Sequence, residues 1–261
     1  MKKDKKAAIF ILIFLIAGAI IFFLTIGVDL INSNENIIII GDSGGFKKIN
    51  NSRWVRINTR DELKSLSSNV SKFNIYVDNS YFGKYKLFYD DKWYLFKNGN
   101  TPVNYNGNML ALSGSIKYKI ANFTTHDIED KTYVNRVLKE NNISEDSILT
   151  YSYYTDIDLN NDGVLERIYT ISNKFPYEDI GSLSFSYIFM IKNDKIIYLY
   201  KNKEELDDVY SGCNPYISNL IDIDEDNKLE VIIGCSYYSV EGTKYNLYKF
   251  NGYMFKSLVS N

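Results

Sequence analysis

Two acidic segments in the second half of the chain contain the residues whose types and spacing point to chemistry. Residues 157–166 read IDLNNDGVLE and residues 221–230 read IDIDEDNKLE, and the two align without a gap 64 residues apart. Counted from Asp158 and from Asp222, oxygen-bearing side chains recur at positions 1, 3, 5 and 9. Calcium takes about six to eight oxygen ligands at ~2.3–2.6 Å, and a tight loop with this spacing can wrap one ion. The repeat therefore predicts two Ca²⁺ sites.

The sixth position of each segment must turn sharply, commonly with a positive φ. Gly163 and Asn227 stand there, and both residue types tolerate that conformation. Without a cation, the two loops would bring together seven carboxylates at the matched positions, and like charges repel at close range. The alternative is a pair of solvated acidic turns that hold no ion. Two copies in register, each closed by a glutamate, favour calcium.

The flanks of these loops distinguish them from an EF-hand. That motif needs a bidentate Glu at position 12, where Tyr169 and Ile233 stand, and it needs helices where this sequence predicts strands. The pattern D-x-[DN]-x-D-[GN]-x-x-E between strands is instead similar to the FG-GAP or VCBS-type repeat of integrin α-chain β-propellers and many bacterial surface proteins. The resemblance covers about residues 148–261 in two copies, although the FG and GAP signatures are absent.

The resemblance implies one four-stranded blade for each repeat, and two blades alone do not close a propeller ring. It also implies a ligand set for each ion. The implied ligands are the side chains of Asp158, Asn160, Asp162 and Glu166, the side chains of Asp222, Asp224, Asp226 and Glu230, and the backbone carbonyls of Val164 and Lys228.

The N-terminal segment is typical of a membrane anchor. Residues 7–28 contain 22 residues without a charge, enough for a helix that spans the ~30 Å hydrocarbon core. Four lysines precede the segment, whereas Asp29 and Glu35 follow it, which places the N-terminus in the cytoplasm. A secretory signal has a shorter apolar core of about 7–15 residues, so we expect a retained single-pass anchor rather than a cleaved signal. In either case the rest of the chain lies outside the cytoplasm.

That compartment affects the two cysteines, Cys213 and Cys235, which lie 22 residues apart. Outside the cytoplasm they can form a disulfide, and the alternative is two unpaired buried thiols. The sequence alone does not decide between them.

Composition and charge define the general class of protein. The chain has 23 Tyr and 15 Phe but 3 Pro, which favours sheets. The net charge of −2 divides into +3 for residues 1–28 and −5 for the remainder, and an acidic body argues against nucleic acid as a partner. We therefore expect a mainly β fold with a few short helices, and no nucleic-acid partner.

Local signals divide the chain into five parts. The Thr59-x-x-Glu62 capping box predicts a helix at about residues 60–68, and helical spacing predicts another at about 127–141. Asn193-Asp194 reads as a turn between strands. The predicted parts are a cytoplasmic tail and anchor (1–28), a linker (29–45), a small antiparallel β domain (46–122), a helical connector (123–147) and two calcium-loop repeats resembling propeller blades (148–261).

Enzymatic signals are weaker than the calcium pattern. Residues 41–45 read GDSGG, the serine motif of chymotrypsin-like proteases, but the only histidine, His126, lies far downstream, so we interpret this stretch as linker. Asp156, Asp158 and Asp162 resemble a glycosidase pair, yet a loop dense in oxygens favours a cation over a neutral carboxyl. One histidine and two cysteines make a zinc site improbable. We therefore expect a protein that is not an enzyme.

The expected function is a membrane-anchored extracytoplasmic calcium-binding module for surface interaction or envelope association. Its partners would be the membrane, through residues 7–28, and a surface protein or glycan that the sequence does not identify. Two alternatives stay open: an extracytoplasmic sensor or regulatory subunit of a membrane complex, and an envelope hydrolase.

Overall fold

The computed structural model shows a mainly β protein, with two short helices among the residues that it describes. It describes residues 36–42, 44–49, 53–57, 59–69, 72–97, 101–114, 121, 123–173, 183–205, 213–236 and 243–259. Within these residues the strands form three sheets, and every pair of neighbouring strands in them is antiparallel. The predicted fold class is confirmed to this extent.

The first sheet has seven strands in the order β3-β2-β1-β7-β4-β5-β6. Its strands are β1 (Ile37–Ile40), β2 (Gly44–Ile49), β3 (Arg53–Ile57), β4 (Phe73–Val77), β5 (Ser80–Asp90), β6 (Lys92–Phe96) and β7 (Met109–Leu112). Helix α2 (Arg60–Asn69) contributes Leu63 and Leu66 to the core on one face of this sheet.

The second half of the chain forms two further sheets, each a meander. The outer sheet has the order β12-β11-β10-β9-β8, and the middle sheet has the order β13-β14-β15-β16. The outer sheet contains β8 (Thr125–Asp127), β9 (Tyr151–Ile157), β10 (Glu166–Ser172), β11 (Leu183–Lys192) and β12 (Lys195–Glu205). The middle sheet contains β13 (Asn214–Ile221), β14 (Glu230–Ser236), β15 (Thr243–Phe250) and β16 (Phe255–Ser257).

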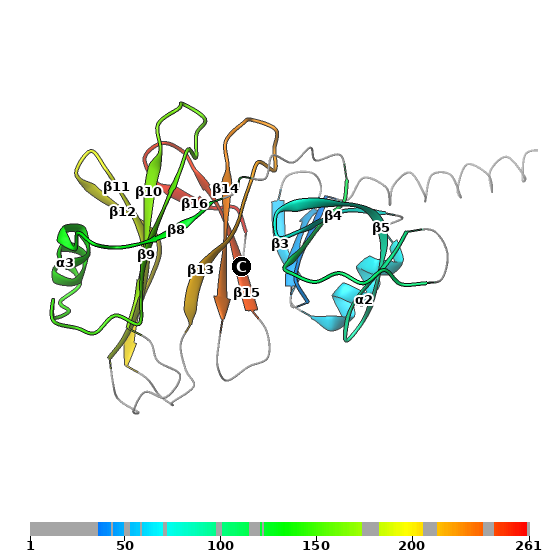
Figure 1. The fold of residues 1–261 in the computed structure, drawn as a ribbon, viewed down its shortest axis with the longest axis horizontal. Coiled ribbons are helices and arrows are strands. Elements are labelled where there is room, and N and C mark those ends of the chain that lie inside the picture. Colours follow the sequence, from blue (N-terminus) through cyan, green and yellow to red (C-terminus); the bar gives the residue numbers. More distant parts are fainter. Residues whose placement is uncertain are drawn as a thin grey trace, which may run out of the picture.

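Across Figure 1, α3 (Thr132–Glu140), the outer sheet, the middle sheet and the first sheet follow one another as layers, and α2 packs on the curved first sheet beside β5. The middle sheet is buried on both faces. Ile232 of β14 packs toward the first sheet, whereas its neighbours Val231 and Ile233 pack toward the outer sheet. This explains why β14 is apolar without alternation, as expected for a strand covered on both sides. Among the described residues the sheets form a face-to-face stack and no closed propeller ring.

Part of the predicted linker (29–45) belongs to the first sheet: Ile37–Ile40, which the sequence allowed as a first strand, forms β1, and residues 44–45 begin β2. Strand β1 lies in the interior of the first sheet, paired with β2 and β7. Ile37 and Ile39 point into the core beneath α2, and Ile38 and Ile40 point into the core shared with the middle sheet. Four consecutive apolar residues are therefore needed because both faces of this strand are buried.

The first sheet, from the predicted small β domain, and the middle sheet, from the predicted repeats, share a hydrophobic core. A single hydrophobic cluster joins them, with Phe46 and Trp54 on one side and Ile221 and Leu247 on the other. Arg56 of β3 also donates from Nε to the carbonyl of Tyr245 in β15, 2.7 Å away.

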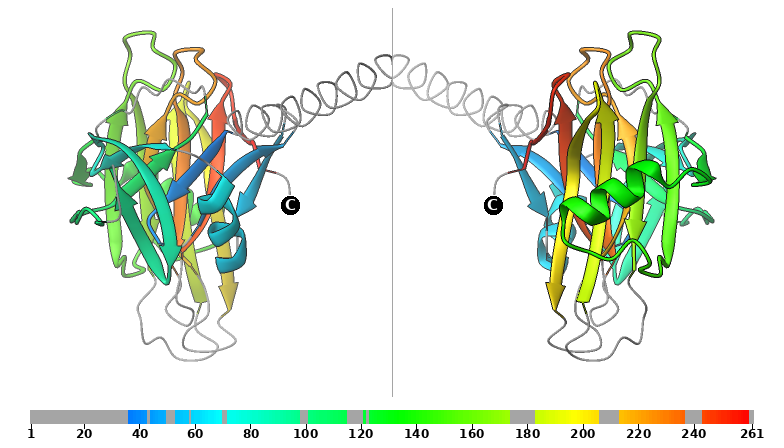
Figure 2. Two further views of the ribbon diagram at one scale, coloured as in Figure 1. Left: turned by 90° about the vertical axis from the view of Figure 1, so that its right-hand side faces the viewer. Right: turned by 90° about the vertical axis from the view of Figure 1, so that its left-hand side faces the viewer.

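Both predicted helices exist, with corrected bounds for the second. In α2 the capping box is formed: the amide of Glu62 donates to Thr59 Oγ1 at 3.1 Å, and the amide of Thr59 donates to Glu62 Oε2 at 3.2 Å. Helix α3 begins at Thr132, not near residue 127, because β8 pairs with β9 over residues 125–127. Figure 2 shows α3 lying across the outer face of the outer sheet.

No helix within the described ranges is long and apolar enough to cross a membrane. The predicted anchor, residues 7–28, lies outside those ranges.

Candidate metal centre

The two acidic segments form equivalent connections in adjacent sheets. Loop one (residues 158–166) joins β9 to β10, and loop two (residues 222–230) joins β13 to β14, where the closing glutamate of each loop is the first residue of the following strand. Both loops lie at the same end of the stack, at the top of Figure 1. The amide of Leu229 donates to the carbonyl of Leu159 at 2.8 Å, so the loops are joined directly. Both leucines are buried in the core between the two sheets.

The backbone conformation repeats as well as the sequence. At position 6, Gly163 has φ +83° and Asn227 has φ +61°, which confirms the predicted turn. At position 4, Asn161 and Glu225 also have positive φ, +58° and +63°. The sequence reasoning missed this second turn. Asn161 was the available signal, because Asn enters the left-handed region more readily than most residues.

Position 1 anchors each loop through its carboxylate. The amide of Gly163 donates to Asp158 Oδ2, and the amide of Asn227 donates to Asp222 Oδ2, both at 2.9 Å. The same bond at the same position in both copies shows that the aspartates determine the loop conformation as well as its charge.

Position 5 makes a second shared bond. The amide of Val164 donates to Asp162 Oδ1 at 2.8 Å, and the amide of Lys228 donates to Asp226 Oδ1 at 3.0 Å. The resemblance implied the carbonyls of these two residues, Val164 and Lys228, as backbone ligands. Val164 is 64% exposed, so it lies at the surface of loop one.

Position 9 closes each loop with a buried glutamate. Glu166 Oε2 accepts from the amide of Leu159, and Glu230 Oε2 accepts from the amide of Ile223, both at 2.9 Å. Glu230 is fully buried, and this burial raises its pKa to about 7. Burying a carboxylate is costly unless a cation compensates it. The buried carboxylate of Glu230 therefore requires a positive charge nearby.

Loop two fits a hard divalent cation. Oxygens of Asp222, Asp224 and Asp226 all lie within 4.8 Å of one another. Asp222 is 4% exposed, and its Oδ1 is buried without a hydrogen-bond partner. A buried carboxylate oxygen without a hydrogen-bond partner, beside two further carboxylates, is an arrangement that suits a metal ion.

Loop one has the same frame but a looser arrangement. Its three carboxylates, Asp158, Asp162 and Glu166, do not gather within the distance seen in loop two. Asp158 Oδ1 accepts from the amide of Asp162 at 3.1 Å, and Asn160 Nδ2 donates to Asp162 Oδ2 at 2.8 Å. Hydrogen bonds from the amide of Val164 and from Asn160 hold the pKa of Asp162 below its ordinary value. These oxygens are engaged within the loop itself.

Lysines beside both loops were missed by the sequence reasoning. Lys249 of β15 lies opposite Glu230 in the sheet register, and its Nζ is 2.6 Å from Asp224 Oδ2 and 2.8 Å from Asp226 Oδ2. Lys192, at the end of β11, lies 3.6 Å from Glu166 Oε1. Nothing in the spacing of the acidic residues indicates these lysines, because strand pairing brings them there.

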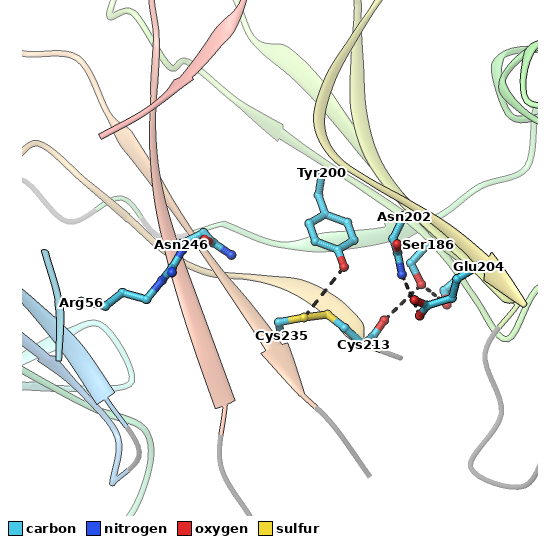
Figure 3. Close-up of a disulfide and its surroundings, with 9 residues drawn as sticks. Arg56, Ser186, Tyr200, Asn202, Glu204, Cys213, Cys235 and Asn246 are labelled. Atoms are coloured by element: carbon cyan, nitrogen blue, oxygen red, sulfur yellow. Dashed lines mark hydrogen bonds between the residues drawn. A yellow bond between two sulfur atoms is a disulfide. The ribbon is translucent and has the colours of Figure 1, made fainter. Parts of the chain in front are cut away.

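Of the two alternatives for the cysteines, a disulfide or two buried thiols, the structure contains the disulfide. Cys213 and Cys235 are bonded, with their Cα atoms 5.4 Å apart, and no free cysteine remains. Figure 3 shows the hydroxyl of Tyr200 directed at Cys235, and Ser186 Oγ donates to the carbonyl of Cys213 at 3.2 Å. The bridge joins the end of the β13–β14 hairpin opposite loop two, so that hairpin is constrained at both ends.

A cavity of about 630 Å³ lies beside β8 and the start of α3, and His126 is among its lining residues. His126 stacks on Tyr154, with ring centroids 5.2 Å apart. Asp130 also lines the cavity, and hydrogen bonds from the side chain and amide of Thr132 hold its pKa below the ordinary value. Asp130 therefore stays ionised at neutral pH and does not fit the general acid of a glycosidase.

Comparison of the chain with known protein families, with characterised proteins and with solved structures finds no match.

Proposed function

We propose that this protein is a calcium-stabilised β module on the outer side of a membrane, anchored by residues 7–28, and that it serves surface interaction or envelope association. The observation that carries the proposal is loop two, where oxygens of Asp222, Asp224 and Asp226 lie within 4.8 Å of one another and Asp222 Oδ1 is buried without a hydrogen-bond partner. The resemblance of residues 148–261 to the FG-GAP and VCBS-type repeats rests on the two loops.

Three further features support the proposal. Loop one repeats the backbone turns and anchoring hydrogen bonds of loop two, as expected if both serve one purpose. The Cys213–Cys235 disulfide suits an oxidising compartment. The uncharged segment 7–28 has the length of a membrane span.

Calcium would act here as a structural ion. Both loops join strands of packed sheets, and each contributes a leucine to the core between those sheets. An ion that draws the carboxylates of a loop together would hold these hairpins in register and remove the repulsion between the acids. A rigid end of the stack then presents the loops to a partner.

Calorimetric titration of the full chain in detergent with CaCl₂ tests the proposal. The wild type is expected to bind two ions, and Asp158→Asn and Asp222→Asn are each expected to lose one. Titration with MgCl₂ tests the choice of ion, because Mg²⁺ demands octahedral geometry and gives up its water reluctantly. Binding is therefore expected to be weaker for magnesium.

A matched control removes the same charge from a position that is not a predicted ligand. Glu225→Asn places in loop two the residue that loop one carries at this position, Asn161, which has a similar positive φ. Both ions are expected to bind this variant. The proposal fails if millimolar calcium gives no binding heat, or if Glu225→Asn weakens binding as much as Asp222→Asn.

A further inference from the structure

The ammonium group of Lys249 sits among the carboxylates of loop two. Its Nζ lies 2.6 Å from Asp224 Oδ2, 2.8 Å from Asp226 Oδ2 and 3.1 Å from Glu230 Oε1. The lysine side chain is 22% exposed, so most of it is held within the protein. Three carboxylates of one loop therefore converge on a single cation that belongs to the chain.

These carboxylates are also the proposed metal ligands. A calcium ion would lie at about 2.3–2.6 Å from the oxygens that bind it. The nitrogen of Lys249 lies 2.6–3.1 Å from one oxygen of each of three proposed ligand residues, so an ion that draws these carboxylates together would compete with the ammonium for the same space. Lys249 would therefore leave when a metal enters.

We infer that Lys249 is an internal competitor of the metal, and that it sets the calcium affinity of loop two. This inference rests on the proposed function and specifies how that site is regulated. With four carboxylates at its matched positions, loop two would otherwise attract a cation more strongly than loop one, which has three. The tethered ammonium offsets this difference.

Lys249 keeps its positive charge among these carboxylates. Burial lowers the pKa of Lys249, but hydrogen bonds to Asp224 and Asp226 outweigh burial and hold the pKa above its ordinary value. The side chain is therefore an ammonium at neutral pH.

Loop one contains a weaker version of the same arrangement. Continuing the β10–β11 register two residues past Ile168 and Met190 brings Lys192 opposite Glu166, as Lys249 lies opposite Glu230. Lys192 stays 3.6 Å from Glu166 Oε1 and lies over the ring of Phe250, with its Nζ 5.0 Å from the ring centroid. It engages one carboxylate of its loop where Lys249 engages three.

The test removes the lysine charge and measures calcium binding at loop two alone. The full chain carries Asp158→Asn to silence loop one, and calorimetric titration with CaCl₂ compares it with and without Lys249→Met. Affinity is expected to rise at least tenfold, equivalent to about 1.4 kcal/mol at 25 °C. Lys256→Met is the matched control, because Lys256 lies opposite Lys249 on β16 and is exposed, and the ion pairs of the described residues do not include one between Lys256 and the acids of loop two.

Each outcome decides the inference. A tenfold gain in Lys249→Met with no gain in Lys256→Met supports it, as does binding at loop two that appears only in Lys249→Met. Equal affinities in the two variants, or weaker binding in Lys249→Met, overturn it while leaving the calcium sites intact. No calcium binding to any variant or to the wild type overturns the proposed function as well. If Lys249→Met does not fold in chelator, as judged by circular dichroism, Lys249→Gln takes its place, because its amide can still donate to Asp224.

Discussion

Replacing Cys213 and Cys235 together by alanine is expected to lower the stability of the protein by about 3.4 kcal/mol. The two cysteines are 22 residues apart, and the loop-closure entropy of a bridge of that length gives about 3.4 kcal/mol at 25 °C. Alanine is the appropriate replacement because both sites are buried and a serine hydroxyl would need a partner there. For a chain of this size the change corresponds to a fall in melting temperature of roughly 7–14 °C.

Differential scanning calorimetry in chelator, with and without reductant, measures this effect. The reduced wild type is expected to melt near the temperature of the double variant. The melting temperature of the double variant is expected to be the same with and without reductant. Because the bridge acts mainly by restricting the unfolded chain, calcium affinity at loop two is expected to be unchanged in the double variant.

Two results would refute this reasoning. The first is a melting temperature of the wild type that does not respond to reductant, together with two titratable thiols in denaturant. The second is a large loss of calcium affinity at loop two in the double variant, which would mean that the bridge shapes the folded hairpin.

Three further predictions follow from the packing and the proposed sites. Gly45→Ala is expected to cost about 1–3 kcal/mol, since its Cβ would lie 2.0 Å from the carbonyl oxygen of Ile38, whereas Gly44→Ala, with its nearest atom at 3.3 Å, should cost clearly less in urea unfolding. Phe189→Ala is expected to cost about 3–5 kcal/mol by the same assay, because Phe189 is fully buried beneath α3, and a loss under about 1 kcal/mol would contradict its place in that core. Calcium at about 100 times its dissociation constant is expected to stabilise the chain by ~2.7 kcal/mol for each site, and a melting temperature equal in calcium and chelator would contradict this.

The sequence predicted the parts of the structure that short-range interactions determine. The capping box of Thr59 and Glu62 specifies the start of α2 within one helical turn. The turn at Asn193-Asp194 follows from two adjacent residues that tolerate positive φ, and the structure gives them +51° and +58°. The two acidic loops belong to the same class, because their shape depends on hydrogen bonds between residues at most seven positions apart.

Long-range pairing determined the rest. The apolar run at residues 37–40 allowed a first strand, but its place in the interior of the sheet depends on β7, about 70 residues away, which pairs with β1. Lys249 reaches loop two only through the register of β15 on β14, and the disulfide forms because β13 and β14 bring its cysteines together. Burial on both faces of a strand, and the cation that meets an acidic loop, depend on which sheets stack against each other. The stacking of the sheets depends on core residues from many segments of the chain, so it cannot be predicted from any single segment.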